Sequence, residues 1–228
     1  MNKSRIEKFF YYLLVILMAF LPLVIFVYAP REKVMGDVQR IFYLHVSSAW
    51  VGFFAFFVVF VSGIFYLRRR QPEWHFIARA SAEIGVFFTT YVLGSGMLWA
   101  RAAWRTWWVW DARLTTTLIM WFIYLGYLFL HLVTRDKSEN QQKLTAIYGI
   151  IAFINVPLVF MSIRWWRTMH PVVIDMEGGG LSPRMVQVLI YSLVTLTFLY
   201  FYLLFYRRNQ LKIERKISEL REQIKTRV

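Results

Sequence analysis

The sequence predicts an all-α integral membrane protein that crosses the bilayer with six transmembrane helices. Hydrophobic residues make up 58% of the 228 residues and aromatic residues 19%, whereas soluble proteins are about 45–50% apolar. The charged residues are concentrated between long apolar stretches, which is typical of membrane proteins and not of disordered chains. A helix needs about 20 residues to cross about 30 Å of hydrocarbon, and six stretches of this kind are present.

The six expected spans cover residues 9–29, 46–67, 80–98, 114–133, 144–163 and 185–206. They form one transmembrane domain over residues 1–206. The first span is followed by charged residues and lacks a small-residue cleavage site. We therefore interpret it as a retained helix and not as a removed signal peptide.

Lysine and arginine predict the orientation of the chain. With the N-terminus inside, the inner segments contain 18 of these residues and the outer loops contain 9. Because cytoplasmic loops carry the excess of positive charge, both termini are expected in the cytoplasm. The formal net charge of +14 then reflects contacts with anionic lipid head groups, and we do not expect nucleic-acid binding.

The segment after Tyr206 has a different composition. Residues 207–228 are predicted to form a basic amphipathic cytoplasmic tail with apolar residues spaced 4, 3 and 4 apart, namely Ile213, Ile217, Leu220 and Ile224. This stripe is too short to identify a coiled coil. The tail is expected either to lie on the inner leaflet or to meet a partner.

Two kinds of residue that are absent or rare limit the functions that the chain can have. The chain contains no cysteine, which excludes disulfides, thiolate metal sites and covalent haem attachment. The spans carry almost no charge. Arg79 and Glu83 lie four residues apart at the inner start of the third span and are expected to pair. The lack of ionisable groups near mid-membrane argues against an ion-coupled transporter.

The segment 99–115, between the third and fourth spans, is unusually rich in tryptophan. Four of them fall within seven residues, namely Trp104, Trp107, Trp108 and Trp110. If the segment is helical, the first three share one face with Asp111, with Arg101 one turn earlier, and Trp110 points elsewhere. An aromatic belt or a helix lying flat in the interface are the structural alternatives.

A flat aromatic surface with cations at its rim suits a porphyrin, which is an apolar disc with two carboxylates. Each tryptophan can cover about 150–250 Å² of apolar surface. Arg101, Arg105 and Arg113 suit the propionates, because a guanidinium binds a carboxylate through two parallel hydrogen bonds. Asp111 could hold one of these arginines or an indole N–H. A stack of bases or a quaternary amine would suit the same surface.

Haem iron needs axial donors, and the chain has four histidines. His45, at the mouth of the second span, and His170, between the fifth and sixth spans, lie on the expected outer side. A second aromatic and cationic cluster, Arg164-Trp-Trp-Arg167, precedes His170. Imidazole is a common axial ligand of haem. His75 and His131 lie on the inner side, and we interpret them as structural.

The run Trp104-Arg-Thr-Trp-Trp-Val-Trp-Asp111-Ala-Arg-Leu-Thr115 resembles the "WWD" signature of the haem-handling proteins of cytochrome c maturation. Three further motifs resemble its six-span family, haem exporter protein C (CcmC): Arg-Ile-Phe-Tyr-Leu-His45-Val, Arg-Trp-Trp-Arg-Thr-Met-His170 and Asn155-Val-Pro157. The resemblance covers residues 10 to 206. The family usually has glycine where this chain has Ala100 and Arg105, and a Gly-to-Arg change removes backbone freedom.

The resemblance implies a haem-binding protein of the bacterial inner membrane that is not an enzyme. Its Trp-rich segment would bind haem b edge-on as transient cargo, with His45 and His170 as axial ligands. Such a protein delivers haem to a periplasmic haem chaperone (CcmE). It associates with an ABC-type CcmA/CcmB unit and the small subunit CcmD.

Two other functions remain open from the residues. One is a transporter that moves haem or another amphipathic solute across the bilayer, which needs an inner acceptance site and a path between the helices. The other is a structural subunit with an aromatic interfacial anchor.

Overall fold

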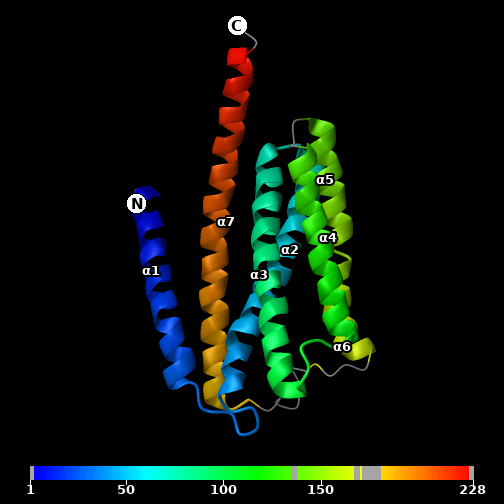
Figure 1. Cartoon of the computed structure of the whole chain (residues 1–228). Coiled ribbons are helices and arrows are strands. Elements are labelled where there is room, and N and C mark those ends of the chain that lie inside the picture. Colours follow the sequence, from blue (N-terminus) through cyan, green and yellow to red (C-terminus); the bar gives the residue numbers. More distant parts are fainter. Residues whose placement is uncertain (1–2, 135–137, 167–169, 171–180, 226–228) are drawn as a thin grey trace.

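The expected all-α architecture is confirmed by a computed structural model, which describes residues 3–134, 138–166, 170 and 181–225. In the described residues, long helical stretches run alongside one another, and six of these stretches are long and apolar enough to cross a membrane (Figure 1). The Trp-rich segment lies at the end of the bundle opposite the chain termini. Both termini lie at one end because the number of crossings is even, and the Trp-rich segment lies at the other end because it follows the third crossing.

The helices of the described chain are α1 (Lys3–Leu23), α2 (Arg40–Arg69), α3 (Pro72–Trp104), α4 (Ala112–Thr134), α5 (Glu139–Ala152), α6 (Asn155–Trp165) and α7 (Pro183–Lys225). A π-helical turn, η1 (Val24–Tyr28), extends α1, and a 3-10 turn, η2 (Asp37–Gln39), precedes α2. Several helices exceed the expected spans, because polar residues at their ends continue the helix beyond the apolar core. The composition changes after Tyr206, but α7 continues unbroken.

The fifth span is two helices instead of one. α5 ends at Ala152 and α6 begins at Asn155. Pro157 has no N–H to donate to the carbonyl four residues earlier. That carbonyl, on Phe153, accepts a hydrogen bond from the Val156 N–H at 3.0 Å instead. The resulting turn sets the direction of α6, which forms one wall of the cavity described below.

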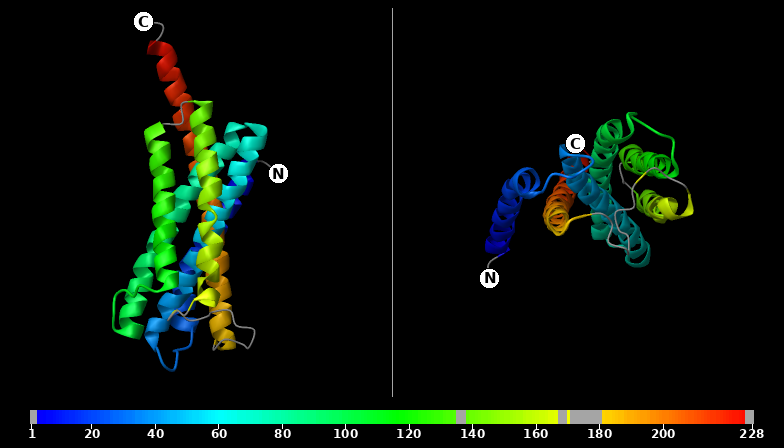
Figure 2. Two further views of the ribbon diagram at one scale, coloured as in Figure 1. Left: turned by 90° about the vertical axis from the view of Figure 1, so that its right-hand side faces the viewer. Right: turned by 90° about the horizontal axis from the view of Figure 1, so that it is seen from below.

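The helices α2 and α3 form the centre of the bundle. A Cβ atom on Gly85 of α3 would lie only 2.5 Å from Cε1 of Phe56 on α2, so glycine permits this close approach. The central pair separates α1 and α7 on one side from α4, α5 and α6 on the other (Figures 1 and 2). Each side has its own buried apolar cluster.

The end of the bundle opposite the Trp-rich segment holds the expected ion pair. Arg79 Nε lies 3.2 Å from Glu83 Oε1, and Glu83 also pairs with Arg207 of α7. The two remaining histidines meet here as well. His75 and His131 are buried, with ring centres 5.0 Å apart. Their meeting was not predicted from the sequence.

Candidate functional site

A cavity of about 240 Å³ opens at the Trp-rich end of the bundle. Its walls come from four helices, α2, α3, α4 and α6, and from the segment that follows α6. Aromatic and cationic side chains from these elements line it, namely His45, Trp50, Trp99, Trp104, Trp108, Arg113, Arg164 and His170. The cavity therefore gathers residues from the second to the fifth spans and from all three expected outer loops.

The two histidines that were expected on the outer side are close neighbours in this cavity. The ring centres of His45 and His170 lie 6.4 Å apart, and their planes are inclined by 32°. His45, expected at the mouth of the second span, lies inside a helix, in the second turn of α2. His170 lies outside the helices. One imidazole is thus carried by a helix and the other by a segment outside the helices.

A serine fixes the state of the His45 ring. Ser95 Oγ lies 2.9 Å from His45 Nδ1, and the same hydroxyl donates its hydrogen to the Tyr91 carbonyl oxygen at 2.7 Å. Because a serine has one hydrogen to donate, its oxygen must accept from His45. We therefore assign the proton of the neutral ring to Nδ1, which leaves the Nε2 lone pair for a ligand.

The neighbouring Gly96 makes room for the same ring. A Cβ atom at this position would lie 3.1 Å from His45 Cε1, so a larger residue would press on the imidazole. Neither Ser95 nor Gly96 was identified from the sequence as part of the site. The cluster of small residues Gly94-Ser95-Gly96 inside an apolar span is the available signal, because small residues in membrane helices mark close approaches.

The Trp-rich segment does not form a helix between Arg105 and Asp111, so the expected single helical face is wrong. The α3 helix ends at Trp104, and Arg105 adopts a left-handed conformation with φ of 59°. This conformation is the one that glycine adopts without strain at the C-terminus of a helix. The chain then runs to α4 without regular secondary structure, and its tryptophans differ in exposure.

Only part of the predicted tryptophan set lines the cavity. Trp104 and Trp108 do so, and Trp99, five residues before Trp104 on α3, joins them. Trp99 and Trp104 pack edge to face, with ring centres 5.3 Å apart. Trp107 and Trp110 are not in the wall, and their side chains are 55% and 74% exposed. They form an exposed aromatic rim instead.

The predicted cations also divide into two groups. Arg113 lines the cavity from the first turn of α4, and Arg164 lines it from α6. Arg101 does not line it. Its Nη1 donates to the Arg105 carbonyl oxygen at 2.6 Å, and its guanidinium lies 5.8 Å from the Trp107 ring centre. Arg101 therefore holds the loop, and the cavity's charge comes from the two other arginines.

Asp111 immediately precedes the fourth helix and caps its first turn. Its Oδ1 accepts a hydrogen bond from the Leu114 N–H at 2.9 Å, and its carbonyl accepts from Thr115 at 3.0 Å. A carboxylate at this position satisfies an N–H group at the start of a helix and stabilises it. The residue thus fixes the start of α4, and with it the position of Arg113.

Two buried indole groups point to a polar ligand. Nε1 of Trp99 and Nε1 of Trp108 have no hydrogen-bond acceptor within the described part of the chain, and both residues line the cavity. A buried donor without an acceptor costs about 1–3 kcal/mol. A ligand with carboxylate oxygens at its edge would remove that cost, so the donor set fits a porphyrin with propionates.

Comparison with known proteins identifies the family of the chain. The family model described as "Heme exporter protein C" matches residues 2–223. A "Putative cytochrome c biosynthesis ccmC-like mitochondrial protein" of Marchantia polymorpha is 34% identical over 159 residues, covering 69% of this chain and 67% of its own length.

Two bacterial relatives carry the name "Heme exporter protein C". The protein of Bradyrhizobium diazoefficiens is 34% identical, over 74% of this chain and 66% of its own length. The protein of Haemophilus influenzae is 31% identical, over 83% of this chain and 78% of its own length. The aligned part thus spans about two thirds to three quarters of these relatives. The chain belongs to the Heme exporter protein C family.

Proposed function

We propose that the chain holds haem b as transient cargo at its Trp-lined cavity and delivers it to a haem chaperone on the extracytoplasmic side. The observation that carries the proposal is the pair of imidazoles, His45 and His170, with ring centres 6.4 Å apart beside that cavity. Two imidazoles on opposite sides of one metal ion, with metal–nitrogen bonds of about 2 Å, have ring centres about 6 Å apart.

The cavity walls supply the remaining contacts. Trp99, Trp104 and Trp108 would cover the apolar porphyrin, and the Arg113 and Arg164 guanidinium groups would bind the propionates. The buried indole N–H groups would donate hydrogen bonds to the same carboxylates. These contacts bind and orient the cargo and transform no bond in it, so the site is a holding site and not a catalytic centre.

The exposed rim suits release of the cargo. Trp107 and Trp110 lie outside the cavity wall with most of their surface exposed, and tryptophan is enriched at protein interfaces. We propose that this rim contacts the periplasmic haem chaperone (CcmE). The ABC-type CcmA/CcmB unit and CcmD are proposed as further partners in the inner membrane.

The test measures haem content and haem transfer separately. Purified protein is loaded with haem, and its absorbance in the Soret region gives the occupancy. The loaded protein is then mixed with the apo-chaperone. We expect Trp108→Ala to lower occupancy, because it removes a cavity wall. The double variant Trp107→Ala/Trp110→Ala should keep its haem and transfer it several-fold more slowly.

The matched control is Trp74→Ala, at the opposite end of the bundle, where Trp74 stacks on Phe65. It should leave occupancy and transfer unchanged. Full occupancy in the Trp108 variant, together with normal transfer from the rim variant, would rule out the proposed roles of both tryptophan groups.

A further inference from the structure

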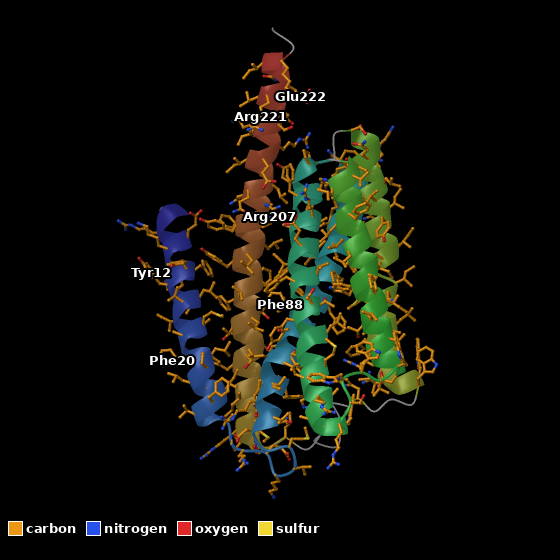
Figure 3. The ribbon with its side chains drawn as sticks, viewed as in Figure 1. Tyr12, Phe20, Phe88, Arg207, Arg221 and Glu222 are labelled. Carbon is orange, nitrogen blue, oxygen red and sulfur yellow. The ribbon has the colours of Figure 1, made fainter. Side chains whose placement is uncertain are left out.

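The last part of α7 extends beyond the other helices and carries an uncovered apolar stripe. Figure 3 shows Arg221 and Glu222 on this part of the helix, past the end of α3. The stripe consists of Ile213, Ile217, Leu220 and Ile224, whose exposed fractions are 60%, 45%, 50% and 64%. Because one residue turns an α-helix by about 100°, the four side chains fall within a narrow band.

The same face of α7 is covered lower down. Phe198 and Tyr202 point in nearly the same direction as the stripe, and α1 packs on them there. The ring centres of Phe10 and Phe198 are 6.5 Å apart, and those of Tyr11 and Tyr202 are 6.1 Å apart. The described part of α1 begins at Lys3. Above it, this face has no covering helix in the described structure (Figure 1).

The opposite face of the extension is fastened to α3. Leu211 is buried, the Arg215 guanidinium lies 5.8 Å from the Phe76 ring centre, and Lys212 Nζ lies 3.2 Å from Glu73 Oε1. These contacts hold the helix with its stripe turned away from the bundle. A surface held in its binding conformation loses less conformational entropy on association.

The flanks of the stripe carry uncompensated positive charge. Some of the other cations on the extension pair with acidic residues. Arg207 pairs with Glu214 at 2.9 Å, and Arg215 pairs with Glu219 at 2.8 Å. Lys216 and Arg221, one on each side of the stripe, make no ion pair with any other described residue. The edges of the stripe therefore favour an acidic partner.

Two other occupants are disfavoured. The membrane surface is out of reach, because α7 continues without a break from its span away from the bilayer.

A second copy would have to pair in parallel, since both copies leave the same membrane. In a parallel two-stranded coil, the residue before one core position lies beside a residue five positions later on its partner. Lys216 would then face Arg221 of the other copy, and like charges repel.

We propose that the stripe, residues 213–224 of α7, is the docking surface for an amphipathic helix of a partner protein. The partner helix presents an apolar stripe flanked by glutamate or aspartate, which pair with Lys216 and Arg221. The partner lies on the side of the membrane where the chain termini lie. This surface is separate from the haem cavity and does not depend on the proposed function.

The experiment uses the full chain in lipid nanodiscs and two synthetic helices as probes. Both peptides carry isoleucine and leucine at the core positions of three heptads. One has glutamate at all flanking positions, and the other has lysine. Fluorescence anisotropy of labelled peptide measures binding. We expect the acidic peptide to bind at least about tenfold more tightly than the basic one, with the difference shrinking at high salt.

Three variants identify the surface. Ile217→Ser should weaken binding of the acidic peptide by about tenfold or more, because it places a hydroxyl in the apolar seam. Lys216→Glu/Arg221→Glu should reverse the preference towards the basic peptide. Lys225→Glu, off the stripe, is the matched charge control and should not reverse it.

The chain has no cysteine, so Ile217→Cys tests self-association directly. Rapid disulfide dimer formation in nanodiscs that hold two copies would show that a second copy occupies the stripe and would overturn the proposal. Equal affinity for both peptides, or unchanged binding by Ile217→Ser, would also overturn it.

Discussion

The hydrogen bond between Ser95 and His45 connects a small residue in α3 to a proposed iron ligand in α2. Ser95→Ala removes the acceptor for His45 Nδ1 and leaves the imidazole free to turn or to change its tautomer. Partners of this kind are worth about 10–100-fold in metal affinity. We expect haem affinity to fall about tenfold, measured by titration of the absorbance near the Soret maximum.

The matched control for this substitution is Ser192→Ala. Ser192 is also buried, donates to the Val188 carbonyl of its own helix at 2.8 Å, and does not line the cavity. Haem affinity should not change in this variant. If both variants bind haem like the unmodified protein, Ser95 has no part in orienting the ligand.

The left-handed conformation of Arg105 leads to a prediction about stability. A residue with a Cβ atom pays about 1–2 kcal/mol in this region, and glycine does not. Because Arg105 accepts the Arg101 hydrogen bond through its backbone carbonyl, Arg105→Gly keeps that contact. We expect a higher melting temperature in detergent. Arg101→Gly, inside α3, should lower it instead, and equal melting temperatures for both would contradict this explanation.

Among single residues, the sequence identified much of the cavity lining. His45, His170, Trp104, Trp108 and Arg113 were all selected from residue type and loop position. The sequence could not identify Ser95, because a serine in an apolar helix usually bonds to its own backbone. The sequence also could not tell which tryptophans line the cavity and which form the rim, because that depends on the irregular loop that follows the left-handed Arg105.

Among the helices, the close packing of α2 on α3 depends on Gly85. A methyl group there would meet the Phe56 ring, which is fully buried and stacks on Tyr124 with ring centres 3.5 Å apart. The ring has no space to move, so Gly85→Ala should destabilise the protein by about 1–3 kcal/mol. Thermal unfolding in detergent measures the loss.

Gly94→Ala in the same helix is the natural comparison. An added Cβ there would meet no atom within 4 Å, and alanine favours a helix interior over glycine by about 1 kcal/mol. The variant should be as stable as the parent or more stable. A similar loss in both variants would mean that helix propensity, not packing against Phe56, controls the stability of α3.

The six spans were predictable because about 20 consecutive apolar residues have few other uses. The division of the fifth span at Pro157 was not. Proline is tolerated in membrane helices when local turns satisfy the freed carbonyl, so its presence alone does not show where a helix ends. The division of the chain into a domain over 1–206 and a tail over 207–228 stays a prediction.

For the whole molecule, the orientation in the membrane is still a prediction from charge. Single cysteines in this cysteine-free chain test it. Val34 lies in the loop before α2 and is 88% exposed, and Ser218 is exposed on the α7 extension. We expect a membrane-impermeant maleimide to label Val34→Cys in intact cells with a permeabilised outer envelope. Ser218→Cys should react only after the inner membrane is broken, and the reverse pattern would contradict cytoplasmic termini.

The central claim is that one iron atom is held between two imidazoles at the outer end of the bundle. Electron paramagnetic resonance of the ferric, haem-loaded protein tests this most directly. We predict a low-spin signal typical of two histidine ligands. His45→Ala and His170→Ala should each convert it to a high-spin signal, and added imidazole should restore the low-spin form. A low-spin signal that survives unchanged in either variant would contradict the account.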